Sequence, residues 1–263
     1  AYGAIVLAAP PAAPEVLSAS AASPVTHQLM GQLRLQLQGL AQQTAAQQAA
    51  AMGIPAPTVT VELTDVVPLL ASDPRGTGMT AAAFPLVLGG MIGGIGLTMA
   101  IGGAWRRVVA LLVYSVVGGL AIPAIMQGWF GVLGGDYLMN AAAFGLTLLA
   151  IGAPIVGFAS LVGRAGVAIG PVLFLLIVNP ISGAAMPKEF LPVPWGDVGQ
   201  WFPPGAGATL IRDLSYFPSA DLTFPWLVLA IWAAGGLALA VLGHFRDARS
   251  VVLEEAPDEP VQP

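Results

Sequence analysis

Long neutral stretches alternate with short charged ones along most of this chain. Five stretches carry no formal charge, at residues 76–105, 108–135, 137–163, 165–187 and 222–245. An apolar helix needs about 20 residues to cross about 30 Å of hydrocarbon, and each stretch reaches that length. The pattern therefore predicts a mainly α membrane protein with five transmembrane helices, at Ala81–Ile101, Arg107–Met126, Leu138–Leu161, Val167–Ala185 and Phe224–His244.

The first 75 residues follow shorter periods, which are typical of a small α/β module. Ser23 stands where a helix N-cap accepts backbone donors, and Pro24 follows at the first helical position. Gly53 marks the end of that helix. Residues 58–66 alternate apolar and polar side chains, as a half-buried strand does. The predicted order is β-β-α-β, at Tyr2–Ala8, Val16–Ala21, Pro24–Met52 and Thr58–Val66.

The predicted helix of this module has an apolar face and a glutamine-rich face. Apolar or small residues recur at helical spacing at Leu29, Met30, Leu33, Leu37, Leu40, Ala41 and Thr44. The solvent face carries Gln28, Gln32, Gln36, Gln42, Gln43 and Gln47. We expect the leucine face to pack on the three strands. A coiled-coil contact with a partner is the alternative.

Basic residues are confined to a few places between the apolar stretches. Lys188 and Arg212 lie in the longer connection before the last stretch, where the charge rule is weaker and which we expect to face outside. The short turns hold Arg106 and Arg107, and Arg164, and the last stretch is followed by Arg246 and Arg249. Because short cytoplasmic loops collect Lys and Arg, we expect these sites to face the cytoplasm of a multi-pass plasma-membrane protein. Residues 1–78 are then extracytoplasmic, and the C-terminus is cytoplasmic.

The chain accordingly divides into three parts. Residues 1–75 form the extracytoplasmic module, residues 76–245 the membrane domain, and residues 246–263 an acidic cytoplasmic tail predicted to be disordered. An external first module has to be carried across the membrane, and residues 1–75 hold no export element. We therefore expect a further apolar helix before Ala1.

Composition and charge narrow the function classes. Of the 263 residues, 56% are hydrophobic and 9% are charged, against about 25% charged in an ordinary globular protein. The net charge of −5 argues against a nucleic-acid partner, and the lack of cysteine excludes thiolate metal sites and thiol nucleophiles. The acids are scattered and no GxxxxGK[ST] phosphate loop occurs, so we expect neither catalysis nor a cofactor in this chain.

The connection between the fourth and fifth predicted spans is the most distinctive segment. Prolines interrupt it, and its aromatic residues are typical of the lipid headgroup region. We expect residues 186–222 to be re-entrant or interfacial, with a short helix at Gly207–Tyr216. The candidate gate residues of this segment are Pro187, Pro192, Trp195, Trp201, Pro203, Pro204 and Arg212.

This order of features resembles the permease subunits of ABC type-2 exporters, in the branch of the phage-infection-protein-like membrane proteins. The matching positions are Gly183, Pro187, Pro192, Pro203, Pro204 and Arg212. The resemblance implies a half-transporter: two copies of the chain form the path in the lipid bilayer, and a separate ATPase subunit drives export of an amphiphilic or cell-envelope-related molecule. A non-transporting envelope protein, whose external module binds a partner, is the alternative.

Further candidate residues have two interpretations each. If an ATPase docks, it should touch the cytoplasmic turns at Trp105, Arg106, Arg107 and Arg164; simple anchoring at the membrane surface is the alternative. Candidate polar residues of a pathway are Asn179, Ser182 and Tyr114. Hydrogen bonding between helices, with Tyr114 as one partner for Asn179, is the alternative. The small-residue pairs Gly89/Gly93 and Gly90/Gly94 should pack inside the bundle rather than form a dimer interface.

Overall fold

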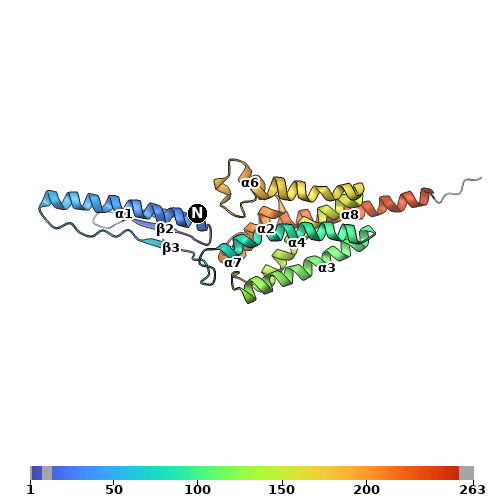
Figure 1. The fold of residues 1–263 in the computed structure, drawn as a ribbon, viewed down its shortest axis with the longest axis horizontal. Coiled ribbons are helices and arrows are strands. Elements are labelled where there is room, and N and C mark those ends of the chain that lie inside the picture. Colours follow the sequence, from blue (N-terminus) through green and yellow to red (C-terminus); the bar gives the residue numbers. More distant parts are fainter. Residues whose placement is uncertain (1, 8–13, 255–263) are drawn as a thin grey trace, which may run out of the picture. The chain divides into compact units, whose positions relative to one another are not determined.

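The computed structural model of the chain describes residues 2–7 and 14–254. The chain divides into two compact units, Ala1–Thr77 and Gly78–Pro263, close to the boundary expected from the sequence (Figure 1). The first unit holds a small sheet and one long helix, and the second is helical.

The first unit contains a three-stranded sheet with the strand order β1-β2-β3. Strand β1 (Gly3–Val6) pairs antiparallel with β2 (Glu15–Ser18), which pairs parallel with β3 (Leu63–Asp65). Helix α1 (Pro24–Met52) connects the two parallel strands and lies along the sheet (Figure 1). As predicted, the Ser23 side chain accepts a bond from the Thr26 amide at the helix start.

Residues 57–61, at the start of the third predicted strand, form hydrogen bonds with glutamine side chains of α1 instead of with a neighbouring strand. Gln38 accepts a bond from the Val61 amide (2.6 Å) and donates to the Val59 carbonyl. One turn later, Gln42 accepts from the Val59 amide (3.0 Å) and donates to the Pro57 carbonyl (3.2 Å). The prediction that Gln42 faces solvent was therefore wrong, and β3 is shorter than the alternation of residues 58–66 suggests.

Only part of the predicted leucine face packs on the sheet. Leu33 and Leu37 are half-buried, whereas the exposed fractions of Leu29 and Leu40 are 47% and 61%. The glutamine contacts rotate the inner face of α1 toward Gln38 and Gln42, so these two leucines point away from the strands.

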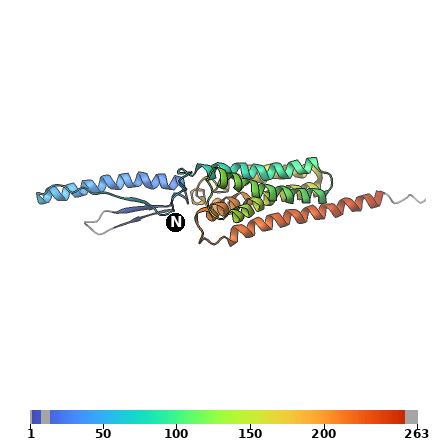
Figure 2. The ribbon, with the colours of Figure 1, turned by 90° about the horizontal axis from the view of Figure 1, so that it is seen from below.

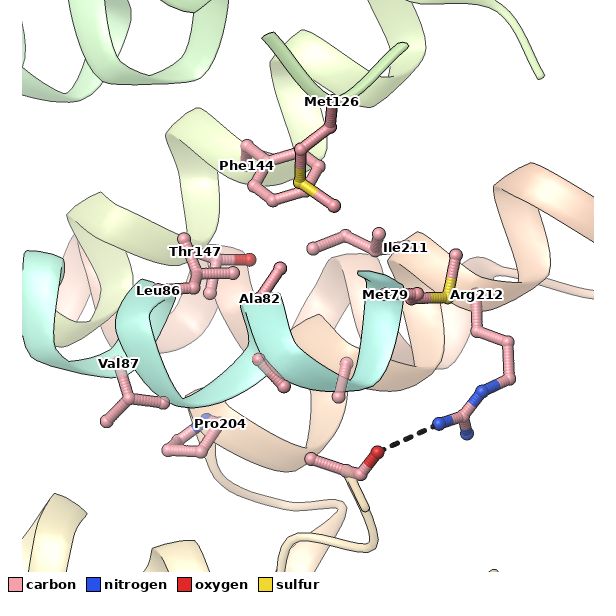
Figure 3. A pocket seen from close by; sticks show the side chains of 13 residues that line it. Met79, Ala82, Leu86, Val87, Met126, Phe144, Thr147, Pro204, Ile211 and Arg212 are labelled. Atoms are coloured by element: carbon pink, nitrogen blue, oxygen red, sulfur yellow. Dashed lines mark hydrogen bonds between the residues drawn. The ribbon is translucent and has the colours of Figure 1, made fainter. Parts of the chain in front are cut away.

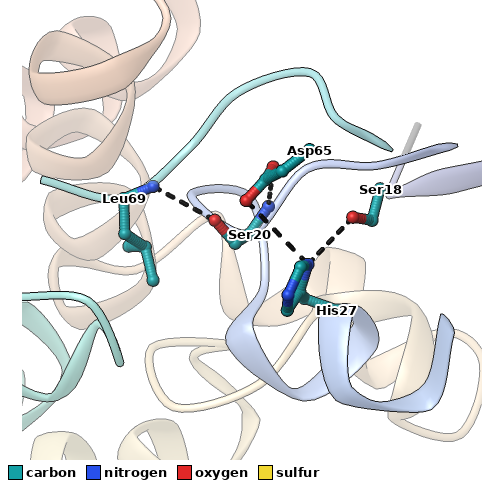
Figure 4. A network of polar contacts seen from close by, with 5 residues as sticks. All are labelled: Ser18, Ser20, His27, Asp65 and Leu69. Atoms are coloured by element: carbon teal, nitrogen blue, oxygen red, sulfur yellow. Dashed lines mark hydrogen bonds and ion pairs between the residues drawn. The ribbon is translucent and has the colours of Figure 1, made fainter. Parts of the chain in front are cut away.

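A serine, a histidine and an aspartate fix the start of α1 to the sheet (Figure 4). The Ser18 hydroxyl lies 2.8 Å from Nδ1 of His27, and Oδ2 of Asp65 lies 3.9 Å from the same nitrogen. Asp65 also accepts from the Ser20 amide at 3.0 Å. A catalytic triad requires the serine and the carboxylate on opposite ring nitrogens. Since Ser18 is also fully buried, this cluster is structural.

The second unit has four helical segments long and apolar enough to cross a membrane. These segments are Thr77–Ala100, Ala104–Trp129, Tyr137–Ala168 and Thr223–Phe245. They contain helices α2 (Thr77–Ala100), α3 (Ala104–Pro123), α4 (Tyr137–Val162) and α8 (Thr223–Glu254), which lie side by side in Figures 1 and 2. The described residues therefore have the character of a multi-pass membrane protein.

Small residues set the packing of these helices around α4. A Cβ added to Gly94 of α2 would lie 2.9 Å from the Gly152 carbonyl, and one on Gly119 of α3 would lie 2.6 Å from the Ala141 carbonyl. On α8, Gly236 approaches the backbone of Pro154 as closely. The prediction that the α2 glycines pack inside the bundle is confirmed for Gly94, because its space is filled by α4.

The same contacts give the direction of each helix. Helices α2 and α8 run parallel to α4, and α3 runs antiparallel to it. We call the end where α2, α4 and α8 begin the proximal end, and the opposite end the distal end. Arg106 and Arg107 lie in the first turn of α3, and Arg164 lies directly after α4, all at the distal end.

The fourth predicted span, Val167–Ala185, is not among the segments long enough to cross a membrane. After α4 the chain reverses at Gly163, whose φ is 75°, and forms a tight helix at Gly163–Ala168 (η2). The chain continues as the nine-residue π-helical segment η3 (Gly170–Val178) and the three-residue α5 (Asn179–Ile181), and this helical run ends there. This apolar helix, Gly170–Ile181, is shorter than the four segments above.

Three short helices follow before α8: η4 (Lys188–Phe190), α6 (Trp195–Gly199) and α7 (Pro203–Tyr216). Helix α7 begins four positions before the predicted Gly207, at two consecutive prolines. Helix α8 extends to Glu254, into the tail that we predicted to be disordered. Residues 255–263 of that tail lie outside the described residues.

Candidate functional site

Two short helices, which we call half-helices, meet near the middle of the bundle. The first lies within the predicted fourth span, and the second contains the short helix predicted at Gly207–Tyr216. The first, η3 with α5, runs back along α4: Gly170 contacts Ile155, and Phe174 packs with Ile151. The second, α7, starts beside α4, where Gly207 lies against Thr147. It ends at the proximal end, where Leu214 and Ser215 touch the loop before α4. Together, the half-helices follow α4 from the distal to the proximal end.

Glycines allow the chain to return to the point where the first half-helix ends. A Cβ on Gly199 would lie 1.8 Å from the Ile181 carbonyl oxygen. A Cβ on Gly205 would lie 2.3 Å from the Gly199 carbonyl oxygen and 3.0 Å from that of Ser182. Backbone packs directly on backbone here, so a side chain at either glycine requires the break to open.

One glutamine joins the two half-helices across this break. Gln200 donates through Nε2 to the Ser182 carbonyl at 2.8 Å and accepts from the Thr209 hydroxyl at 2.6 Å. Ser182 in turn donates its hydroxyl to the Asn179 carbonyl at 2.8 Å. The carbonyls of Asn179 and Ser182, at the end of the first half-helix, thus accept hydrogen bonds within the protein, as its low-dielectric interior requires.

The start of α7 is buried without leaving unpaired backbone donors at its first two positions. Pro203 and Pro204 are both buried, and proline has no N–H group. The Ala206 amide donates to the Phe202 carbonyl at 3.0 Å. The proline pair therefore lets a helix begin in the interior of the bundle, where an ordinary helix start would need a capping side chain.

An apolar pocket lies between α2, α4 and α7 toward the proximal end (Figure 3). Its side chains nearly fill it and leave a cavity volume of about 20 Å³. The pocket is lined by Met79, Ala82, Ala83, Leu86, Val87, Met126, Phe144, Thr147, Ala184, Pro204, Ala208, Ile211 and Arg212. Apolar side chains dominate this lining, and two methionines add adaptable ones.

Arg212 is the single charged residue in the lining of this pocket. It is half-buried, and its guanidinium donates to the Ala184 carbonyl at 3.0 Å (Figure 3). A positive charge at the side of an apolar pocket gives this site an amphiphilic character.

Aromatic side chains fasten the same segment to α8. Trp232 donates its indole N–H to the Trp201 carbonyl at 2.9 Å, and its ring lies 5.5 Å from that of Phe202. The Trp201 ring packs edge-on against Phe224, with the ring centroids 4.9 Å apart. The return of the chain into the bundle is therefore held from both α7 and α8.

The structure brings together only some of the predicted gate residues. Pro204 and Arg212 line the pocket, and Pro203 is buried beside them. Pro192 and Trp195 are exposed and do not line the pocket, while Pro187 is buried without lining it. The sequence analysis missed the pocket residues of α2 and α4 and the bridging Gln200, because their positions follow from packing rather than from any local motif.

The polar residues proposed for a pathway make bonds inside the protein. The Tyr114 hydroxyl donates to the Gly89 carbonyl at 2.7 Å and so links α3 to α2. It is not the partner of Asn179, contrary to our suggestion. Asn179 is half-buried, and its carbonyl accepts from Ser182. The hydrogen-bonding interpretation is supported for Tyr114 and Ser182.

The distal end presents the predicted docking residues. Trp105, Arg106 and Arg164 are exposed, whereas Arg107 is half-buried and donates to the Ile101 carbonyl at 2.7 Å. Trp105 lies at an apolar pocket between α3 and α8 with a cavity volume of about 250 Å³. Arg107 thus helps to close the end of α2, and the other three side chains are accessible.

No group of three or more His, Asp or Glu side chains that could hold a metal ion occurs among the described residues. The comparisons add no second source of information about the site. Neither family models, nor curated proteins, nor solved structures give a match to this chain.

Proposed function

We propose that the chain is the membrane-spanning permease subunit of an ATP-driven exporter of amphiphilic molecules. The broken crossing formed by η3, α5 and α7 carries this proposal. Interrupted helices at membrane depth are tolerated where they are buried in protein or line a cavity, and transporters place binding sites at such interruptions. Here the second half-helix forms one wall of the apolar pocket.

The broken crossing also supports five passages through the membrane. Because the chain reaches the proximal end through α7, α8 can start there and return to the distal end. In this arrangement the proximal end is extracytoplasmic, and the distal end with Arg106 and Arg164 is cytoplasmic. The irregular connection at residues 182–202 between the two half-helices supports the re-entrant interpretation of residues 186–222.

The pocket fits the class of substrate that the proposal names. Its lining is apolar and Arg212 adds a positive charge at its side. Because side chains nearly fill the pocket, a substrate would enter only as α2 and α7 move apart. At the opposite end, exposed Trp105 and Arg106 offer a contact for a separate ATPase subunit. A second permease copy would complete the path.

Purification of the full-length protein together with the products of neighbouring genes tests this proposal. We expect an ATPase to copurify, and proteoliposomes containing both proteins to export a labelled amphiphile in a vanadate-sensitive manner. Without an associated ATPase and without such transport, the proposal fails.

A pair of variants tests the role of the pocket. Ala208→Trp places an indole in the pocket and should reduce transport at least tenfold, because Ala208 lines it. Val117→Trp on α3 is the control, since Val117 is 60% exposed on the outer surface of the bundle. Both variants should retain the ATPase. Equal transport by the two variants would exclude the pocket as the binding site.

A further inference from the structure

The two edges of the small sheet in the first unit differ in how they are closed. On the β3 side, α1 glutamines bind the backbone of the preceding residues, and Glu62 and Asp65 place charge along the edge. On the β1 side, no strand or helix pairs with the edge among the described residues. An open edge is a template for another strand.

The open edge presents two residues with their backbone groups directed outward. The Ala19 amide donates to the Tyr2 carbonyl, which makes these two residues a hydrogen-bonded pair between the strands. Hydrogen-bonded pairs alternate in an antiparallel ladder, so Ala4 and Val6 direct their backbone groups to β2. Gly3 and Ile5 therefore direct theirs away from the sheet.

Apart from its short length of four residues, this edge lacks the features that keep strands apart. Its side chains are apolar and exposed, with exposed fractions of 41% for Ile5 and 46% for Val6. No charged residue occurs between Tyr2 and Pro14. Natural edges are usually protected by lysines, by other charges or by bulges.

We infer that the outer edge of β1 is a strand-pairing surface for a second copy of this chain. The absence of charge selects this occupant: two identical neutral strands pair antiparallel without repulsion, and the two-fold symmetric contact is self-complementary. The small core gives a further reason, because Val16 and Val61 are its only fully buried large side chains in the described part of this unit. Pairing of two copies would join their three-stranded sheets into one six-stranded sheet and cover the β1 edge of each copy.

Like the proposed function, this inference involves a second copy of the chain, but it does not require that the protein transports a substrate. Tethering both copies in one membrane raises their effective concentration, so four residues of strand can suffice for pairing. The outer groups of Gly3 and Ile5 have to face their counterparts. Two registers meet this condition and pair three residues of each β1: one places Ala4 opposite Ala4, and the other places Ala4 opposite Val6.

Cysteine crosslinking in membranes tests the inference, because the full chain has no cysteine. We would introduce Ala4→Cys, Ile5→Cys and Val6→Cys singly and in the pair Ala4→Cys with Val6→Cys. At least one should form a dimer ten times faster under mild oxidation than Thr64→Cys, which is exposed on β3 at the other edge. Two differently tagged copies, coexpressed, identify the product as two identical chains.

A proline variant separates strand pairing from mere proximity. Ile5→Pro removes an outward N–H group that β2 does not use, so the sheet should persist while crosslinking returns to the Thr64→Cys rate. Ile5→Val is the control and should keep the fast rate. Crosslinking no faster than at Thr64, crosslinking to another polypeptide, or insensitivity to Ile5→Pro would each overturn the inference. Copurification of the ATPase, measured in the same membranes, reports separately on the proposed function.

Discussion

Gln38 and Gln42 show how side chains can take the place of a neighbouring strand. Spaced one helical turn apart, they present donor and acceptor together to alternate residues of segment 57–61. The amide of glutamine has the same donor and acceptor groups as a peptide, which explains the match. The fully buried Val61 can therefore keep its backbone paired without a strand beside it.

Replacing Gln38 by alanine should destabilise the first unit. The Val61 amide would lose its acceptor, and a buried unsatisfied group costs about 1–3 kcal/mol. Hydrogen exchange in the full-length protein would measure this as lost protection of the Val61 amide. Gln36→Ala, at an exposed position of the same helix, is the control. Equal protection in both variants would contradict the role of Gln38.

The carboxylate of Asp221 precedes α8 and accepts from the Thr223 amide at 2.9 Å. Hydrogen bonds from the Thr223 hydroxyl and then from its amide lower the pKa of Asp221 below the usual aspartate range. Because the folded state favours the ionised form, this contribution to stability is present above the ordinary pKa. It is lost as the pH falls through the lowered pKa.

We expect Thr223→Val to raise the pKa of Asp221 toward its ordinary value, since the variant removes the hydroxyl donor. Carbon-13 NMR titration of a labelled Asp221 carboxyl would measure the change. Thr223→Ser retains a hydroxyl and should leave the pKa low. A low pKa in the valine variant would show that the hydroxyl is not responsible.

At the scale of elements, the packing of the bundle depends on where backbone meets backbone. Helices α2, α3 and α8 reach α4 through glycines, as helices in lipid often do. The same device closes the break between α5 and α7, where α6 rather than a long helix supplies the glycine. Short and long elements are thus fixed by one kind of contact.

Gly199→Ala should weaken the association of α6 with the end of α5. The added methyl would stand 1.8 Å from the Ile181 carbonyl oxygen, and relief requires a backbone shift. We expect a lower melting temperature, corresponding to about 1–3 kcal/mol of overpacking, and reduced transport. Gly235→Ala on α8 is the matched control, because nothing lies within 4 Å of its added Cβ. Similar melting temperatures for the two variants would contradict tight packing at the break.

At the scale of the whole molecule, the number of crossings depends on whether the two half-helices together traverse the membrane. If they do, the loop before α8 and the turn containing Arg164 face opposite sides. If they do not, both face the same side. In the structure α8 begins at the proximal end and Arg164 lies at the distal end, as the first case requires.

Single cysteines in this cysteine-free chain resolve the question. Ser219→Cys and Arg164→Cys are both exposed positions outside the helices predicted to cross. With a membrane-impermeant maleimide applied to intact cells, Ser219→Cys should be labelled and Arg164→Cys only after permeabilisation. Labelling of both or of neither from one side would exclude five crossings.

The sequence analysis predicted correctly the features that follow from long uncharged stretches or from residues at helix ends. The four continuous spans follow from stretches without charge, and the caps of α1 follow from Ser23 and Gly53. The interruption of the fourth predicted span could not be read in this way, since residues 165–187 are as apolar as the others. Its cause lies in contacts with Gly199 and Gln200, distant in sequence. The pocket was missed for the same reason.

The bridging position of Gln200 has a mechanical consequence. Its amide holds Ser182 at one side and Thr209 at the other, so α7 cannot swing outward on its own. An outward movement of α7 must either break one of these two bonds or carry Ser182 and the end of α5 along with it. A ligand that enters beside Arg212 and displaces α7 would therefore also displace the end of the other half-helix, η3 with α5.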